Sequence, residues 1–185
     1  MTQKADKVIE TIHKAQKRTF LPIIGREKGQ VLVKIMEDEN PQRILEIGTL
    51  VGYSAILMAK HLSKGAVITT IEIDKQMAGA ARKNIKEAGF EEKIELIVGD
   101  ARREIKKLKG EFDVLFLDAA KEQYLGYLKL AEPFLRKGAI VVADNVKIFK
   151  EDMADFLEYV RQSGHYKSKT FDFGQDAVEV SIKVN

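Results

Sequence analysis

The chain has 185 residues, a formal net charge of +3, and 45% hydrophobic against 32% charged residues. This length and balance favour one soluble globular domain, residues 1–185, in which residues 1–40 form a helical cap. No apolar run approaches the roughly 20 residues that span a bilayer, and the N-terminus lacks the apolar core of a signal peptide. We therefore expect a cytoplasmic protein without a membrane partner.

The absence of cysteine excludes disulfides, thiolate metal sites and cysteine nucleophiles. The three histidines, His13, His61 and His165, lie far apart in the chain. Any metal site is therefore expected to be rich in oxygen ligands and suited to a hard divalent cation such as Mg²⁺. The small positive charge neither requires nor excludes nucleic acid.

Two helices are expected before residue 40. Residues 2–19 carry apolar side chains at a helical period, at Val8, Ile9, Ile12 and Ala15. Packing of this helix on the domain is the simpler interpretation, and a lysine-rich face for nucleic acid or a partner is the alternative. Pro22 interrupts the helix, and helical spacing resumes over residues 26–39 until Asn40-Pro41.

The stretch that organises the chain is RILEIGTLVGYS, residues 43–54. It predicts a strand, a tight turn and the start of a helix, with a four-residue step between Gly48 and Gly52. Open α/β sheets hold nucleotide-like cofactors at this kind of turn. Glycine has no Cβ, so both positions permit a sharp turn and a close approach of the backbone.

Strands and helices then alternate. Strands are expected over residues 66–73, 93–98, 112–117 and 139–143, and helices over residues 75–88, 101–108, 121–135 and 152–162. Asp74 is a candidate N-cap, Gly89 a helix stop, and Lys137-Gly138 a turn. Residues 167–173 and 177–184 read as a hairpin. Right-handed crossovers then give a doubly wound α/β sheet of seven strands, mostly parallel, with an antiparallel C-terminal hairpin.

Polar residues follow several strands at the edge where such sheets bind ligands. Glu72 stands 24 residues beyond Gly48, a separation that suits hydrogen bonds to ribose hydroxyls. A solvated acid or a helix cap is the alternative for Glu72, but Asp74 is the better cap. The spacing GxxxG, in place of GxGxxG, favours S-adenosylmethionine over a dinucleotide.

A second group of polar residues indicates a metal site. Asp118 follows the fourth strand, and Asp144 and Asn145 follow the fifth. Adjacent parallel strands lie about 4.8 Å apart, so two carboxylates and an amide oxygen can converge on Mg²⁺. A turn or a helix cap is the alternative for either aspartate alone. Lys121, three residues after Asp118, is a candidate general base, with an ordinary surface lysine as the alternative.

The segments EIGTLVGYS, TIEID, FLDAAKEQY and LRKGAIVVADNV together resemble the cation-dependent O-methyltransferases, the group of catechol and caffeoyl-CoA O-methyltransferases. The resemblance runs from about Leu21 to the hairpin and implies a Rossmann-like S-adenosylmethionine-dependent methyltransferase domain. It implies Lys121 as catalytic base and Asp118, Asp144 and Asn145 as ligands of Mg²⁺, Mn²⁺ or Ca²⁺. Cofactor contacts are implied for Ile24, Glu46, Gly48, Gly52, Ser54, Glu72, Asp100, Ala101 and Asp118.

The chain also departs from these enzymes. Ala119 and Ala120 stand where animal catechol enzymes have bulky residues, and their later substrate-binding glutamate has no clear match, although Thr170 falls nearby. The plant enzymes' substrate-binding insertion is absent.

The reaction implied is transfer of a methyl group to one hydroxyl of an aromatic vicinal diol, by a protein expected to be a homodimer. Methylation of a hydroxylated uridine in transfer RNA is the alternative, and a non-catalytic nucleotide-binding module is a third hypothesis.

Overall fold

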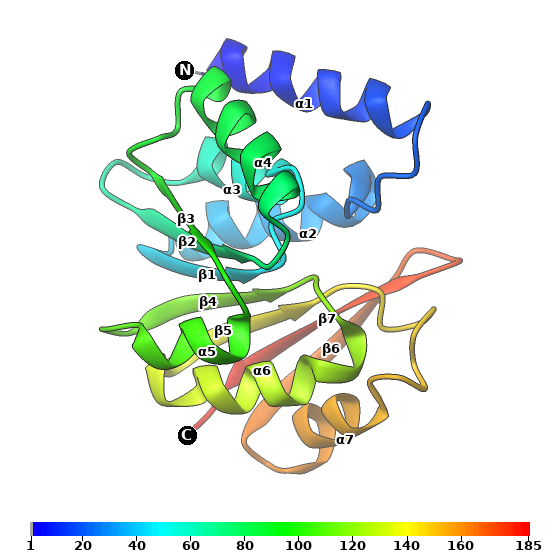
Figure 1. Cartoon of the computed structure of the whole chain (residues 1–185). Coiled ribbons are helices and arrows are strands. Elements are labelled where there is room, and N and C mark those ends of the chain that lie inside the picture. The colour runs from blue at the N-terminus through cyan, green and yellow to red at the C-terminus, as the bar shows by residue number, and fades with distance from the viewer. Residues whose placement is uncertain (1) are drawn as a thin grey trace.

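The computed structural model describes residues 2–185 and contains one seven-stranded sheet in the order β3-β2-β1-β4-β5-β7-β6 (Figure 1). Strands β1 to β5 are parallel, and β7 runs antiparallel to both β5 and β6. This confirms the predicted doubly wound sheet with an antiparallel hairpin. The strands are β1 Arg43–Ile47, β2 Val67–Glu72, β3 Ile94–Val98, β4 Phe112–Leu117, β5 Leu135–Ala143, β6 Tyr166–Asp172 and β7 Ala177–Lys183.

Helices cover both faces of the sheet. They are α1 Thr2–Gln16, α2 Gly25–Glu39, α3 Tyr53–His61, α4 Lys75–Ala88, α5 Ala101–Glu104, α6 Tyr124–Ala131 and α7 Ala154–Gln162. The first four share one apolar cluster and the last three another. Figure 1 shows α1 outside α3 and α4, on which it packs. Within residues 2–185, no helix has the length and apolar character needed to cross a membrane.

The two clusters follow from the alternation of side chains along the strands. Ile44 of β1 belongs to the cluster beneath α1–α4, and its neighbour Leu45 belongs to the cluster beneath α5–α7. Both side chains are fully buried. Because successive strand residues point to opposite faces, a sheet covered on both sides needs apolar residues at nearly every position.

The local signals for helix ends hold at α4. Asp74 accepts hydrogen bonds from the backbone N–H groups of Gln76 and Met77, and Gly89 closes the helix with φ of 76°.

The helix expected over residues 121–135 is shorter than predicted. It begins with a 3₁₀ turn at Lys121–Gln123, and α6 gives way to another at Glu132–Phe134, where Pro133 cannot continue the helical hydrogen bonds.

The turn predicted at Lys137-Gly138 is wrong, because β5 already begins at Leu135 and runs through both residues. Gly138 has φ of 80°, and the pairing of β5 with β4 shifts register between Phe112 and Val114. A bulge therefore absorbs the extra residues of β5. Glycine with positive φ serves a bulge as well as a turn, so the local sequence does not separate the two.

Gly48 lies where the ends of β1 and β4 meet. Its N–H donates to the Ile71 carbonyl, and the Asp118 N–H donates to the Ile47 carbonyl. A Cβ on Gly48 would lie 2.2 Å from the Asp118 carbonyl oxygen, and the residue has φ of 95°. Only glycine fits here, because both the conformation and the space exclude a side chain.

We predict that Gly48→Ala lowers the free energy of unfolding by at least about 2 kcal/mol, since the added methyl group must displace the Asp118 backbone. Gly79→Ala is the matched control. Gly79 is exposed within α4 with open space around it, so alanine there is expected to be neutral or stabilising by up to about 1 kcal/mol. Urea unfolding of both variants measures the difference, and equal stabilities would contradict the close contact.

Candidate functional site

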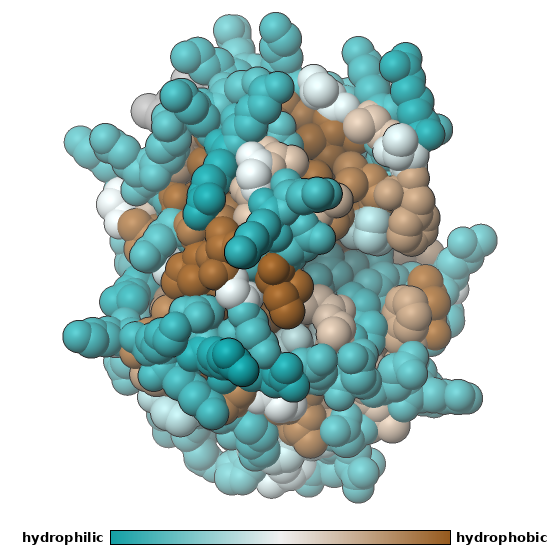
Figure 2. Space-filling view, in the orientation of Figure 1, coloured by the Kyte–Doolittle hydropathy of each residue, from teal (hydrophilic) through white to brown (hydrophobic). Residues whose placement is uncertain are grey.

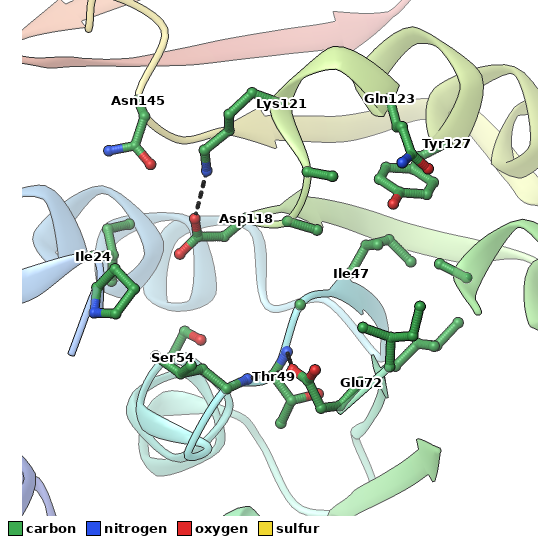
Figure 3. A pocket seen from close by; sticks show the side chains of 18 of the residues that line it. Ile24, Ile47, Thr49, Ser54, Glu72, Asp118, Lys121, Gln123, Tyr127 and Asn145 are labelled. Carbon is green, nitrogen blue, oxygen red and sulfur yellow. Dashed lines mark hydrogen bonds and ion pairs between the residues drawn. The ribbon is translucent and has the colours of Figure 1, made fainter. Parts of the chain in front are cut away.

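A cavity of about 510 Å³ opens at the carboxyl ends of the parallel strands (Figure 3). Figure 3 shows Asp118, Lys121 and Asn145 on one side of it and Ser54, Thr49 and Glu72 on another. The predicted site residues that line it are Ile24, Gly48, Ser54, Glu72, Asp100, Ala101, Asp118, Lys121 and Asn145. Glu46, Gly52 and Asp144 are not lining residues.

Glu72 fixes the turn that follows β1. Its Oε2 accepts hydrogen bonds from the N–H groups of Thr49 (3.1 Å) and Leu50 (2.7 Å), and its Oε1 accepts one from Asp74 (2.8 Å). The side chain lines the cavity, although the residue is only 8% exposed. A carboxylate has about four acceptor positions and these N–H groups take three, so Glu72 keeps one edge for a ligand hydroxyl while it holds the turn.

Behind the cavity wall, Glu46 is fully buried in β1. It accepts hydrogen bonds of 2.5 Å from the hydroxyls of Ser54 and Thr70, and Thr70 in turn contacts Thr49 at 2.5 Å. Burial raises the pKa of Glu46 to about 7, and the two hydroxyl donors only partly oppose this effect. The network joins the cavity residue Ser54 to the core of the sheet.

Gly52 and Asp100 each stand immediately before a helix. Gly52, with φ of 85°, precedes α3, and Asp100 caps α5 by accepting from the Arg102 N–H while pairing with its guanidinium at 2.8 Å. The segment before α2 closes the opposite side, where Ile24 is buried and lines the cavity with Pro22.

Lys121 and Asp118 form an ion pair inside the cavity. The Lys121 ammonium donates to Asp118 Oδ1 and to the Tyr124 hydroxyl, both at 2.8 Å. Tyr124 is fully buried, and its hydroxyl donates to the Leu117 carbonyl at the end of β4. Burial raises the pKa of Tyr124 well above its usual value, with Asp118 and Asp144 adding to the effect. The phenol therefore stays protonated and fixes the position of Lys121.

Asp144 is 1% exposed and meets a cation that belongs to the chain itself. The Lys28 ammonium, from α2, lies 2.7 Å from Asp144 Oδ1 and 2.9 Å from Oδ2, and only the contact to Oδ2 has hydrogen-bond geometry. Burial, together with Asp118, raises the pKa of Asp144 to about 6, although Lys28 acts in the opposite direction. Burial lowers the pKa of Lys28, but Asp144 and Asp176 outweigh this and raise it.

Asn145 adopts the left-handed conformation, with φ of 64°. Its Nδ2 donates to Asp176 Oδ2 at 2.7 Å, and Lys28 donates to the same oxygen at 2.6 Å. Burial raises the pKa of Asp176, but the hydrogen bonds from Lys28, the Ala177 backbone and Asn145 outweigh this and hold it below its usual range. In residues 2–185, no three His, Cys, Asp or Glu side chains form a group suited to a metal.

Several site residues were not found by sequence reasoning. Lys28 and Asp176 contact Asp144 and Asn145 across separations of 116 and 31 residues, and Tyr124 was assigned only to a helix. In the sequence these three residues are recognisable only as polar residues, and nothing nearby indicates that the fold buries them. Thr170, expected near a substrate-binding position, does not line the cavity and instead donates to Glu179 at 2.5 Å.

Comparisons with known proteins identify a family and several relatives of this chain. A family model described as O-methyltransferase matches residues 3–161. Catechol O-methyltransferase B of Danio rerio is 39% identical over 166 residues, which cover 86% of this chain and 62% of that protein. Catechol O-methyltransferase of Sus scrofa is 35% identical over 155 residues, covering 80% and 82%. This chain thus spans about three fifths of the Danio rerio protein and 56% of the Bos taurus enzyme.

Solved structures match over almost the whole chain. The O-methyltransferase TomG from Streptomyces achromogenes, in complex with SAM, has a TM-score of 0.87 at 26% identity, covering 96% of this chain and 91% of that one. A putative O-methyltransferase from Klebsiella pneumoniae has a TM-score of 0.87 at 28% identity, covering 98% and 90%.

The buried Glu46 predicts a specific pH dependence of stability. The folded state holds the proton up to about pH 7, whereas the ordinary value is 4.5, so the native state binds more protons in this interval and its stability falls as pH rises. Relative to the unmodified chain, Glu46→Gln should therefore gain about 2–3 kcal/mol between pH 5 and pH 8.

Urea unfolding of the ligand-free protein at both pH values measures this gain. Glu92→Gln, at an exposed position between α4 and β3, is the control and should follow the unmodified chain. Parallel pH profiles for the Glu46 variant and the unmodified chain would contradict the raised pKa.

Proposed function

The chain belongs to the O-methyltransferase family, and from this premise we propose that it transfers a methyl group from S-adenosylmethionine to a hydroxyl of a catechol-like small molecule, with a divalent cation. The observation that carries the proposal is that two different groups of polar residues line one cavity. Glu72 and Asp100 line one part, and the Asp118–Lys121 pair with Asn145 lines another. A donor and an acceptor bound in these two parts would face each other.

The donor half is proposed from the strand ends. Glu72 would accept hydrogen bonds from the ribose hydroxyls, with Asp100 and Ala101 beside the adenine. Ser54 and the turn at Gly48 would hold the methionine part, and Ile24 would close over it. Each of these side chains or backbone segments lines the cavity. The TomG structure with SAM, from a related fold, supports this choice of cofactor.

The residues present fit a hard divalent cation. Asp118, Asp144 and Asn145 offer two carboxylates and an amide oxygen, and Asp144 Oδ1 is a buried oxygen whose 2.7 Å contact with the Lys28 ammonium lacks hydrogen-bond geometry. A buried carboxylate oxygen without a hydrogen bond is costly, and a cation would satisfy it. These three residues would hold Mg²⁺, which would lower the pKa of the accepting hydroxyl of a bound diol.

Lys121 would act as the base. In its neutral form Nζ takes the proton from the acceptor hydroxyl, and the oxygen then forms a bond to the methyl carbon while the bond from that carbon to sulfur breaks. S-adenosylhomocysteine leaves as the second product. Tyr124 and Asp118 hold Nζ from two directions. Because the transfer is a direct displacement, positioning of the methyl donor and the acceptor supplies much of the rate.

The rim of the cavity suits an aromatic acceptor. Phe20, Ile73 and Phe149 line the cavity and are 94%, 70% and 39% exposed. Hydrophobic side chains also gather around the middle of the face in Figure 2. Large apolar side chains exposed together at a cavity commonly mark a binding surface, and a flat ring with two hydroxyls would contact them while its oxygens reach the polar end.

The direct test is a radiolabelled-methyl screen with and without Mg²⁺. Catechols, caffeoyl thioesters and hydroxyuridine-containing transfer RNA serve as acceptors. Transfer to catechols that requires Mg²⁺ supports the proposal. Transfer only to RNA that is lost at high salt would instead support the RNA alternative. If calorimetry detects no binding of S-adenosylmethionine, the non-catalytic module is supported.

Asp144→Ala is predicted to lower kcat/KM at least about 100-fold, because the site loses a cation ligand. The S-adenosylmethionine Kd, measured by calorimetry, should stay within about threefold, since Asp144 does not line the cavity. Full activity of this variant in EDTA would refute the metal assignment.

Lys121→Met is predicted to lower kcat by about 10²–10⁴-fold with a nearly unchanged cofactor Kd, as expected for loss of a general base. Lys64→Met, at an exposed position before β2, controls for the loss of one positive charge and should keep full activity. A Lys121→Met enzyme with unchanged kcat between pH 6 and pH 9 would exclude Lys121 as the base.

A further inference from the structure

The carboxamide of Asn145 has two chemically different ends. The oxygen can bind a cation, whereas the amino group carries two donors and would repel one. A rotation of half a turn about the last side-chain bond exchanges them. Whatever decides which end faces the cavity therefore decides whether Asn145 can serve as a ligand.

Asp176 makes that choice. It lies at the start of β7, is 7% exposed, and its Oδ2 accepts from Asn145 Nδ2 at 2.7 Å. An ionised carboxylate has acceptors only, so the amino group of Asn145 must face Asp176. The carboxamide oxygen is then directed the other way, and Asn145 lines the cavity.

Asp176 is itself held from several sides. Lys28 donates to its Oδ2 at 2.6 Å and also contacts Asp144, so one ammonium braces both residues. The Phe173 N–H donates to the Asp176 carbonyl at 2.8 Å, and the Val146 N–H donates to the Ala177 carbonyl at 3.0 Å. The first bond closes the hairpin turn that carries Asp176, and the second fixes the hairpin against the residue after Asn145.

We propose that Asp176, braced by Lys28, is a positioning residue that presents the carboxamide oxygen of Asn145 to a divalent cation. The proposal rests on the cation dependence of the proposed function. Asp176 is not counted as a ligand, because its Oδ2 is already shared by Lys28 and Asn145 and its Oδ1 accepts from the Ile148 N–H at 3.4 Å.

The test is a double-mutant cycle read by direct Mn²⁺ binding, with the free ion measured by electron paramagnetic resonance. In the unmodified chain, Asp176→Ala should raise the Mn²⁺ Kd about 10–100-fold, the usual cost of losing a residue that orients a metal ligand. In an Asn145→Asp background, Asp176→Ala should not weaken Mn²⁺ binding, because a carboxylate presents oxygen at both ends. The substitution at position 145 also adds a repulsion with Asp176 that Asp176→Ala relieves, so any change in this background should be towards tighter binding.

Three further measurements complete the design. Asp176→Asn keeps an acceptor oxygen for Asn145 and should weaken Mn²⁺ binding less than Asp176→Ala does. Asp152→Asn, at an exposed position before α7, should leave the Kd unchanged. The S-adenosylmethionine Kd of every variant should stay within about threefold, which also establishes that each variant is folded.

The outcomes separate the two proposals. If the unmodified chain binds no Mn²⁺, the cation dependence fails and this inference fails with it. If Mn²⁺ binds and Asn145→Ala weakens it, but Asp176→Ala weakens binding equally in both backgrounds, Asp176 is merely structural and only this inference is overturned.

Discussion

The close approach of Gly48 to the Asp118 carbonyl sets the geometry of the whole site. The hydrogen bond from the Asp118 N–H to the Ile47 carbonyl holds the ends of β1 and β4 together, at a distance that no side chain on Gly48 permits. One of these ends leads into the turn that Glu72 fixes, and the other carries Asp118 and Lys121. Because β1 and β4 are adjacent near the middle of the sheet, the two groups of polar residues that line the cavity have a fixed separation before any ligand arrives.

The buried charged groups at the cavity have hydrogen-bond or ion-pair partners within the chain itself. Backbone N–H groups meet Glu72, hydroxyls meet Glu46, and an ammonium meets Asp144. Buried polar groups of this kind destabilise a fold unless they are paired, so the apolar clusters on both faces of the sheet must offset them. In return, the polar groups at the cavity are held in place before ligands bind, which is the condition for electrostatic stabilisation to be effective.

The parts of the fold that depend on neighbouring residues were predictable from the sequence. The strand ends, the Asp74 cap and the hairpin all follow from patterns within about ten residues. Lys28 and Asp176 were missed, because they lie 148 residues apart and meet only when α2 packs against the beginning of β7. Lys28 looks like any lysine on an amphipathic helix. The bulge at Gly138 was misread for the opposite reason. A glycine signal was present in the local sequence, but glycine with positive φ serves both a turn and a bulge.

The position of β7 has a consequence for the order of assembly. This strand lies between β5 and β6 although it follows both in the chain. During synthesis, β6 therefore emerges before its place in the sheet exists, and β5 keeps an open edge until residues 177–183 are available. Asp176 arrives with this last segment, so Asn145 and Lys28 gain their shared partner only at the final step. The part of the cavity lined by Asp118, Lys121 and Asn145 is thus completed after the part lined by Glu72 and Asp100, and a ribosome-bound chain that lacks β7 would leave Asn145 without its Asp176 partner.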